Sequence, residues 1–575
     1  MENLYYEVAL PLPLRNSFTY SSNIKISNGS RVQVPFRNRE IVGYVLKKQS
    51  SPNVKSIKPI TKVLDRNSLI DKPSYDLIHW IANYYKAPIG EIFKSYFPPF
   101  LRKGKEINDS IEVYAISNLG KLASKESFGR AKKQFEALEV FQHKSELSRP
   151  GLKANKISKA ILDALISKGY LEKKSRNRNE LKTNKELNSK AFFELNDEQN
   201  KIYKSIKNSS TNLTHLIFGV TGSGKTEIYF HLIRDFIEKG KQVLILVPEI
   251  GLTPNLKAEI ERRFGEDNVA LLHSEMSEKD RAHAWNDINK GFKSILIGTR
   301  SAIFTPFKDL GLIVVDEEHD SSYKQIDGFR YSARDVAVYR ANLEKIPVIM
   351  CSATPSLESL KNCQDEKYCL HKLTRRVKDA RQPKFEISDL RSSELKSGLT
   401  EYSLNEISKE LSKGNQVLVF LNKKGYAPMV FCNKCGWTPE CSNCDVSMVY
   451  HINPKRLVCH HCGTKHPMPV ACLNCNEESL EFFHTGTEKL EEFLKEYFKN
   501  TPVIRVDREA LGKEQLRSNS VLPDSKEPLI LVGTQILAKG HHMPNLTLVL
   551  VVDADSGLFS VDHKASERLA QLLIQ

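Results

Sequence analysis

One stretch of the chain constrains the fold more than any other: a short apolar run that leads into a glycine-rich loop and then into a helical pattern. The loop fits G-x-x-x-x-G-K-[ST] completely. In this pattern the backbone N–H groups face a phosphate, the lysine adds a positive charge and the last hydroxyl holds Mg²⁺. We predict an ATP site with Lys225 as a catalytic residue and Thr226 as a Mg²⁺ ligand, the alternative being an ordinary glycine turn. The predicted ATP-binding residues are Gly219, Val220, Thr221, Gly222, Ser223, Gly224, Lys225 and Thr226.

A second apolar run, Leu312 to Val315, ends in the acidic sequence Asp316-Glu317-Glu318-His319. An acid at the end of a strand is the second half of a phosphoryl-transfer site. We predict that Asp316 completes the Mg²⁺ shell and that the catalytic Glu317 orients or deprotonates the attacking water. An exposed acidic turn is the alternative.

Strand and helix patterns alternate on both sides of these motifs, which predicts parallel sheets with their loops at the carboxyl edge. The expected strands are the apolar runs 243–247, 295–297, 312–315 and 348–350, and a second series at 417–420, 503–506, 529–532 and 546–552. Before residue 105 the pattern is β-rich with Gly, Pro and Asn between the runs. Residues 106–190 are helical, followed by a basic hairpin-like stretch and a charged linker.

The chain of 575 residues carries a formal charge of +16, which suits a polyanionic partner such as nucleic acid, although a merely basic surface would give the same value. No apolar run is long enough for a membrane span, and the start shows no secretion signal. We therefore expect a cytoplasmic protein without a membrane partner.

Eight of the 11 cysteines form four Cys-x-x-Cys pairs, which in a reducing compartment indicates metal binding. Eight thiolates are enough for two closed, structural Zn²⁺ sites, and the spacing leaves three ways of pairing the knuckles. His460 and His461 are alternative ligands, but because eight cysteines are available we interpret them as surface residues that contact DNA. The predicted zinc ligands are Cys432, Cys435, Cys441, Cys444, Cys459, Cys462, Cys472 and Cys475.

Aromatic and positive side chains alternate between residues 323 and 334, a pattern that suits base stacking and phosphate pairing on single-stranded DNA. A buried loop is the alternative. The candidate DNA-binding residues are Tyr323, Lys324, Phe329, Arg330, Tyr331 and Arg334.

These motifs resemble the DExH helicases of superfamily two, and more narrowly the PriA-type replication restart helicases, over nearly the whole chain. The resemblance implies that Gln199 reads adenine, that the 323–334 loop couples DNA binding to hydrolysis, and that Phe18 and Lys58 lie in a pocket for a nascent 3′ end. It also implies nested zinc knuckles, with Cys432, Cys435, Cys472 and Cys475 on one ion. The resemblance is carried by 8–11, 32–36, 80–85, 219–226, 247–253, 272–274, 298–304, 316–319, 351–356 and 533–542.

The resulting fold class is a multidomain α/β protein with two RecA-like P-loop parallel-sheet lobes, a zinc-binding insertion, a β-rich DNA-binding domain and a winged-helix domain. The expected boundaries are 1–105 for the 3′-DNA-end-binding domain, 106–190 for the winged helix and linker, 191–380 for lobe 1, 381–430 and 479–575 for lobe 2, and 431–478 for the insertion.

The function implied by the resemblance is an ATP-dependent 3′–5′ DNA helicase that recognises abandoned forks, unwinds the lagging arm and initiates primosome assembly. The implied cofactors are ATP, Mg²⁺ and two Zn²⁺. The implied partners are forked and single-stranded DNA, single-strand-binding protein, primosome proteins and the replicative helicase, in a bacterial cytoplasm. A fork-binding zinc adaptor with an ATP switch and no unwinding is the alternative. The family's last motif, with its arginine finger, would follow Arg568, so we expect a chain ending at Gln575 to hydrolyse ATP slowly.

Overall fold

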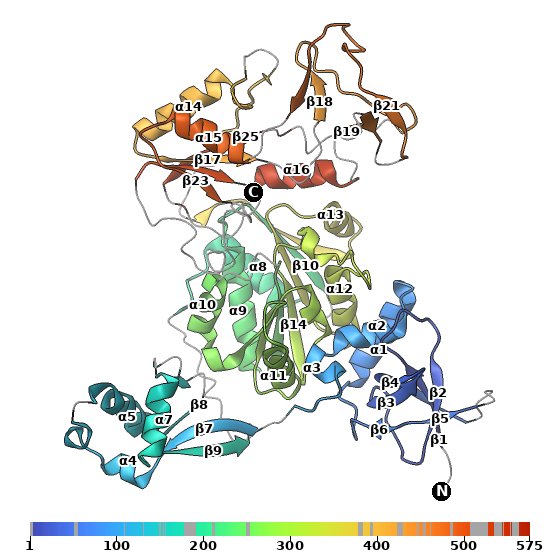
Figure 1. Cartoon of the computed structure of the whole chain (residues 1–575), viewed down its shortest axis with the longest axis vertical. Helices are drawn as coiled ribbons and strands as arrows, with labels where there is room; N and C mark the ends of the chain where they lie inside the picture. Colours follow the sequence, from blue (N-terminus) through green and yellow to red (C-terminus); the bar gives the residue numbers. More distant parts are fainter. Residues whose placement is uncertain are drawn as a thin grey trace.

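The computed structural model describes residues 4–50, 56–107, 110–129, 131–148, 151–152, 155, 157–177, 191–209, 213–248, 254–377, 383–390, 395–421, 429–444, 448–451, 456–459, 462–483, 487–506, 527–533, 543, 545–552, 554 and 563–575. Figure 1 shows a central lobe with the N-terminal unit against one side, a small unit set apart, and a second lobe that carries a strand-rich extension. Among the described residues, no helix is both long and apolar enough to cross a membrane.

The N-terminal unit is a mostly antiparallel sheet in the order β5-β2-β1-β4-β3-β6. Val8, Val32, Val34 and Val45 fill its core, as the alternating sequence pattern predicts. The strands are β1 (Leu4–Ala9), β2 (Phe18–Ser22), β3 (Arg31–Phe36), β4 (Arg39–Gln49), β5 (Lys58–Pro59) and β6 (Lys62–Val63).

Three helices, α1 (Lys72–Tyr84), α2 (Ile89–Tyr96) and α3 (Pro99–Arg102), follow that sheet and fasten to it. Tyr44 of β4 stacks on Phe93 and Phe97 with ring centroids 5.0 and 5.4 Å apart. Arg31 forms a buried ion pair with Asp65 at 2.7 Å and donates to the Leu101 carbonyl at 2.6 Å. The sheet and the helices are therefore one packed unit.

The same helices also pack on the central lobe. Trp80 of α1 stacks on Tyr339 with ring centroids 3.6 Å apart, and the Trp285 Nε1–H donates to the Tyr96 carbonyl at 3.1 Å. Apolar residues of α1, α2 and α3 belong to the hydrophobic cluster that covers one face of the central sheet. The helices of the unit expected at 1–105 thus join it to lobe 1, because they bury apolar side chains against both.

The small unit has a three-stranded antiparallel sheet in the order β8-β7-β9 and its own core around Leu138, Phe141 and Leu165. The sequence predicted a basic hairpin after Gly169; the structure instead pairs that basic strand, β9, with β7 from the start of the unit. The winged-helix assignment stays a prediction. The elements are β7 (Ser110–Ile116), α4 (Asn118–Leu122), α5 (Lys132–Lys144), β8 (Glu146–Ser148), α7 (Lys159–Ser167) and β9 (Leu171–Asn177).

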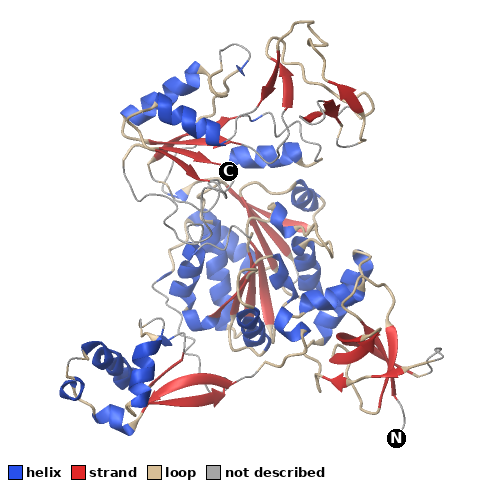
Figure 2. Cartoon of the chain, viewed as in Figure 1, coloured by secondary structure: helices blue, strands red, loops and turns tan. Residues whose placement is uncertain are grey.

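Lobe 1 is built on a parallel sheet in the order β12-β13-β11-β14-β15-β10-β16, with helices on both faces (Figure 2). The fully buried strands β11 and β14 explain the continuous apolar runs in the sequence. The strands are β10 (Thr214–Gly219), β11 (Gln242–Leu246), β12 (Val269–Leu272), β13 (Ile295–Gly298), β14 (Leu310–Val315), β15 (Val348–Ser352) and β16 (Tyr368–Leu373). The helices are α8 (Asp197–Lys207), α9 (Lys225–Glu238), α10 (Pro254–Phe264), α11 (Glu278–Asn289), α12 (Ala333–Glu344) and α13 (Leu357–Gln364), with the 3₁₀ turns η6 (Arg300–Phe304) and η7 (Ser321–Tyr323).

Lobe 2 has a smaller parallel sheet in the order β23-β24-β17-β25, and the cysteine-rich insertion leaves it after β17. An antiparallel pair, β18 with β22, closes the base of the insertion. The lobe comprises α14 (Glu401–Ser412), β17 (Gln416–Leu421), α15 (Thr487–Tyr497), β23 (Val503–Val506), β24 (Ile530–Gly533), β25 (Leu546–Val552) and α16 (Ala565–Ile574). The insertion comprises β18 (Met429–Cys432), β19 (Val449–His451), β20 (Arg456–Val458), β21 (Lys465–Pro467) and β22 (Leu480–Phe483).

Candidate active site and metal centres

The glycine-rich loop lies between β10 and α9, as predicted, and its shape depends on residues in the left-handed region. Gly222 has φ +77° and Gly224, which precedes α9, has φ +80°. The Lys225 Nζ donates to the Gly219 carbonyl at 2.8 Å within the loop. The Ser223 Oγ is buried and has no hydrogen-bond partner among the described residues. This combination of N–H groups at a helix start, a lysine and a spare hydroxyl fits a polyphosphate.

Gln199 of α8 contacts the glycine-rich loop, a structural role in addition to the one that the resemblance implied. Its Nε2 donates to the Ser223 carbonyl at 2.9 Å, and its Oε1 accepts from the Asn196 N–H at 3.0 Å in a capping box at the start of α8. A Cβ at Gly224 would lie 2.3 Å from that Nε2, so only glycine allows the approach. Gln199 therefore braces the loop from α8; its reading of adenine stays a prediction. The spacing N-x-x-Q was the available sequence signal.

The acid box begins where β14 ends, and β15 separates β14 from β10 in the sheet. The Asp316 carboxylate accepts from the Tyr229 hydroxyl at 3.2 Å and from the Glu317 N–H at 3.0 Å. Burial raises the pKa of the Asp316 carboxyl, while the charge of Lys225 lowers it. A nearby cation would favour the ionised form of this buried acid, so the site fits Mg²⁺.

Glu317 has a backbone strained in a way that singles it out within the acid box. Its φ is +46°, in the left-handed region that non-glycine residues rarely adopt. Its carboxylate lies 3.5 Å from the His319 Nδ1. Strain of this kind is kept where the surroundings over-determine a residue's position. The roles of Lys225, Asp316, Glu317 and Thr226 stay predictions, although the structure brings the two motifs to one edge of the sheet.

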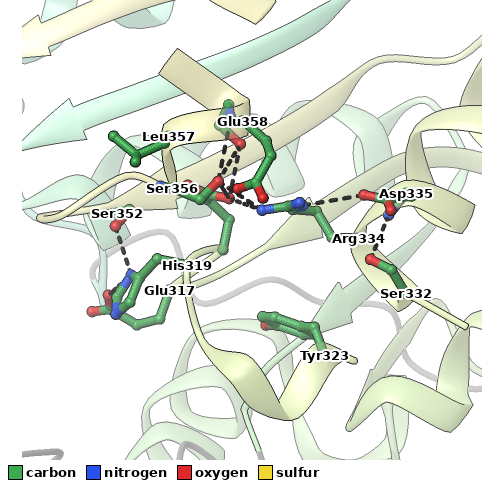
Figure 3. A network of polar contacts seen from close by, with 12 residues as sticks. Glu317, His319, Tyr323, Ser332, Arg334, Asp335, Ser352, Ser356, Leu357 and Glu358 are labelled. Carbon is green, nitrogen blue, oxygen red and sulfur yellow. Dashed lines mark hydrogen bonds and ion pairs between the residues drawn. The ribbon is translucent and has the colours of Figure 1, made fainter. Parts of the chain in front are cut away.

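Glu318, which the sequence left without a role, is the centre of a buried polar network, and Figure 3 labels Arg334, Asp335 and Ser356 of that network. Its carboxylate accepts from the Ser356 N–H at 2.7 Å, from the Ser359 Oγ at 2.9 Å and from the Arg334 Nη1 at 3.1 Å. Burial alone would lower the pKa of the Arg334 guanidinium. The charges and hydrogen bonds of Glu318 and Asp335 together have a larger effect, so the pKa is raised. The network joins the acid box to the first turn of α12 and to the start of α13.

His319 joins the acid box to the end of β15 and to α16 of lobe 2. Its Nδ1 lies 2.8 Å from the Ser352 Oγ, and its Nε2 lies 2.8 Å from the Gln575 Nε2. A proton on Nδ1 satisfies both contacts, since the glutamine amide donates to Nε2. The Gln571 Nε2 also donates to the Thr354 carbonyl at 3.3 Å. Lobe 2 thus touches the acid box through Gln575, which caps α16, and touches the neighbouring Thr354 through Gln571 of the same helix.

The aromatic residues of the 323–334 loop differ from the prediction. Tyr323, Phe329 and Tyr331 are 2, 5 and 1 % exposed. The rings of Phe329 and Tyr331 stack 5.0 Å apart, and the Tyr323 hydroxyl donates to the Leu246 carbonyl at 2.9 Å. These rings offer no open face to a base in this structure, because the cores of lobe 1 and α1 enclose them.

The charged residues of the same loop divide into two kinds. Lys324 and Arg330 are exposed and stay predicted DNA contacts. The Arg334 side chain is half-buried. It pairs with Glu318 and Asp335 and donates a hydrogen bond to Ser356. A direct contact between Arg334 and DNA would therefore compete with the polar network in Figure 3.

The structure places the two predicted residues of the 3′-end pocket on neighbouring strands. Phe18 begins β2, and its ring meets Phe36 edge to face at 5.2 Å. Lys58 of β5 pairs in parallel register with Tyr20, two residues after Phe18, and is exposed. Their binding of a DNA end stays a prediction.

The eight knuckle cysteines gather in two sets of four, and within each set all the sulfur atoms lie within 4.8 Å of one another. The pairing is the nested one. The Cys432 and Cys475 sulfurs are 3.5 Å apart, and the Cys441 and Cys462 sulfurs are also 3.5 Å apart. Four converging thiols fit a tetrahedral Zn²⁺ site. The outer set is Cys432, Cys435, Cys472 and Cys475, and the inner set is Cys441, Cys444, Cys459 and Cys462.

Three of the knuckles share one turn. In each, the residue after the second cysteine has a positive φ and its N–H donates to the carbonyl of the first cysteine, as Gly436, Gly463 and Asn476 do at 2.8–2.9 Å. This left-handed step points both sulfurs to the same side. His460, His461, and the predicted motif residues 249–253 and 534–542 lie outside the described residues.

Comparisons with known proteins agree with this arrangement. The PriA 3′DNA-binding domain (3′BD) family matches residues 7–98, the DEAD/DEAH box helicase family matches 196–363, and the PriA DNA helicase Cys-rich region (CRR) domain matches 441–467. The chain is 40 % identical over 582 residues to replication restart protein PriA of Haemophilus influenzae, covering 99 % of this chain and 79 % of that protein. It is 33 % identical over 608 residues to PriA of Chlamydia pneumoniae, covering 100 % and 79 % of the two chains, and 34 % identical over 572 residues to PriA of Rickettsia conorii, covering 99 % and 76 %. The chain belongs to the PriA family of replication restart proteins, and its central lobe is a helicase domain.

Proposed function

We propose that this chain is an ATP-dependent DNA helicase of replication restart that binds an abandoned fork, moves 3′ to 5′ along single-stranded DNA and unwinds the lagging arm. One observation carries the proposal. The phosphate loop after β10, the acid box after β14 and the end of β15 meet at the carboxyl edge of three adjacent strands. Ligands of parallel α/β sheets bind at this edge.

The residues of this edge divide the work of ATP hydrolysis. Lys225 exchanges its bond to the Gly219 carbonyl for a phosphate oxygen. Thr226 and Asp316 would hold Mg²⁺, which would supply positive charge beside the phosphates. Glu317 holds the attacking water. Glu318 keeps Arg334 and the start of α13 in place behind it, so a shift of either one is felt at the acid box.

His319 and α16 supply the link between the two lobes. Nucleotide binding at the acid box shifts Asp316 or Glu317, and His319 carries that shift to Gln575 through the contact at 2.8 Å. A lobe-to-lobe link of this kind is what a translocating helicase needs, because its two lobes must alternate between two arrangements.

Two Zn²⁺ ions in the nested cysteine sets would hold the insertion together. The further partners that we propose are single-strand-binding protein, the primosome proteins and the replicative helicase. A fork-binding adaptor that does not unwind is less well supported, because it has no use for a site in which the water-positioning acid, the metal-binding acid and the lobe-to-lobe link are all assembled.

Strand displacement tests the proposal. Forked DNA with either a 3′ or a 5′ single-stranded tail is incubated with the chain, with and without ATP and Mg²⁺. We expect ATP-dependent displacement on the substrate that supports 3′-to-5′ movement, and none with Lys225→Ala. Fork binding without displacement on either substrate would support the adaptor instead.

A further inference from the structure

A cavity of about 230 Å³ lies at the junction between the N-terminal unit and lobe 1. Its walls come from the end of α2 and from α3 on one side, and from α11, η6 and the 323–334 loop on the other. It is smaller than the usual pocket for a whole small molecule, about 300–1,000 Å³. The polar residues in its lining are Ser95, Arg102, Arg281, Ser301, Thr305 and Gln325.

Two arginines, one from each side, line this cavity, and no carboxylate is among its lining residues. Burial lowers the pKa of both Arg102 and Arg281, and the charge of Arg281 lowers that of Arg102 further. The Arg102 Nε donates to the Phe97 carbonyl at 2.6 Å. The Arg281 Nε is buried without a hydrogen-bond partner among the described residues. Glu278, the acid whose charge reaches both, is ion-paired with Lys103 at 2.7 Å.

A third group in the lining is also unsatisfied. Thr305 is 1 % exposed, and its Oγ1 has no hydrogen-bond partner in the described part of the chain. Two desolvated guanidinium groups that repel each other, beside a spare buried donor, are costly unless an anion fills the space between them. Guanidinium groups match the geometry of phosphate oxygens.

We propose that this cavity is a phosphate-binding site, formed jointly by Arg102 of the DNA-end-binding unit and by Arg281 and Thr305 of lobe 1. The phosphate is a phosphodiester of single-stranded DNA that runs along the junction of the two units. The cavity is too small for a base and its sugar together, so it reads backbone and not sequence. The existence of the anion site does not depend on the proposed function. The identification of the anion as a DNA phosphate does rest on that function.

The first experiment titrates the chain with inorganic phosphate by calorimetry at constant ionic strength. It uses the Lys225→Ala background, which removes phosphate binding at the ATP site. We expect saturable binding that weakens at least about tenfold in Arg281→Gln, since a hydrogen bond to a charged group is lost. Arg66→Gln, which removes an exposed arginine of the N-terminal unit that does not line the cavity, should change nothing.

Thr305→Val is a second variant that avoids a folding defect. It removes an unsatisfied hydroxyl, so the free chain should be as stable as the parent or more stable, yet phosphate should bind more weakly, by about threefold or more. A role for Thr305 in packing alone would leave phosphate affinity unchanged, and that result would contradict the site.

The second experiment distinguishes DNA from free phosphate. The affinity for a single-stranded oligonucleotide is measured across a range of salt concentrations. Loss of one phosphate contact should reduce the slope of log affinity against log salt by about 0.7 in Arg281→Gln, but not in Arg66→Gln. An unchanged slope with lost phosphate binding would assign the site to free phosphate and overturn its supply by DNA. If neither quantity changes, the proposal is wrong, whether or not the chain unwinds forks.

Discussion

The ATP site of lobe 1 and the cysteine-rich insertion of lobe 2 both depend on left-handed residues at tight turns, yet they are stabilised in different ways. Gly222 and Gly224 lie between the largely buried strand β10 and helix α9, and Gln199 braces them from another helix. Gly436 and Gly463 lie in a unit whose small core includes the zinc cysteines themselves. The first site is shaped by packing before any ligand arrives, whereas the second depends on the ligand for its shape.

The largest effect is expected from the insertion. Cys432→Ser should lower the zinc content from two ions to one and disorder the outer knuckles, because apparent binding energies of structural zinc are about 10–16 kcal/mol and most of that stabilises the fold. ATP binding by lobe 1 should survive. Elemental analysis and limited proteolysis measure the two parts, with Cys369→Ser, outside both sets, as the control. Loss of ATP binding together with zinc would break the distinction between the two regions.

Replacement of Lys225 should impair ATP hydrolysis and leave the cysteine-rich insertion unchanged. Lys225→Ala is expected to lower ATP turnover by about 10²–10³-fold or more, the usual effect of deleting a group that stabilises transition-state charge. The fold, the zinc content and fork binding should stay. A DNA-stimulated ATPase assay measures this, with Lys201→Ala on the exposed face of α8 as the matched control. Turnover within twofold of the parent would mean that the loop is not the catalytic phosphate site.

Glu318→Ala tests whether packing alone maintains the ATP edge. It leaves Arg334 without its buried partner, and we expect a loss of about 3 kcal/mol in the stability of lobe 1. Chemical unfolding followed by a probe in lobe 1 measures it. Glu238→Ala breaks a surface pair with Arg234 and should cost under about 1 kcal/mol. Equal costs for the two variants would show that the network is not a structural element.

The smallest effect is expected for the hydrogen bond from Gln199 to the Ser223 carbonyl. Gln199→Ala loses a cap and the bond to Ser223, and should weaken ATP binding about five- to tenfold, an effect of about 1 kcal/mol. Gln199→Glu retains the capping box but not the N–H donor to Ser223, so it isolates that bond. Equilibrium binding of ATP decides between the roles: a Gln199→Glu variant with full affinity would show that the contact with Ser223 does not shape the site.

The sequence alone predicted the strands of both lobes and the local motifs of the two sites. Both series of parallel strands are confirmed, because fully buried strands give continuous apolar runs. The glycine loop and the acid box are short local patterns, so their meeting at one sheet edge follows from topology. The knuckle spacing indicated two metal sets, but their nested pairing depends on how β18 and β22 close the insertion, which spacing alone does not specify.

The surfaces between units could not be predicted. The alternation of aromatic and charged residues at 323–334 is the same for a DNA-binding loop and for a buried one. What decides between them is the presence of Tyr85 and Phe304, whose rings pack on Phe329 and Tyr331 from remote parts of the chain. The same holds for Trp80, whose stack on Tyr339 joins α1 to a remote part of lobe 1.

The stack of Trp80 on Tyr339 sets a frame of reference for movement. Because α1–α3 share a core with lobe 1 and Tyr44 fastens the N-terminal sheet to them, that sheet cannot swing without opening a hydrophobic core. Under the proposed function, a DNA end bound by the sheet would therefore keep a fixed position relative to lobe 1. Nucleotide-driven movement between the lobes would then displace lobe 2 along the strand relative to that fixed end.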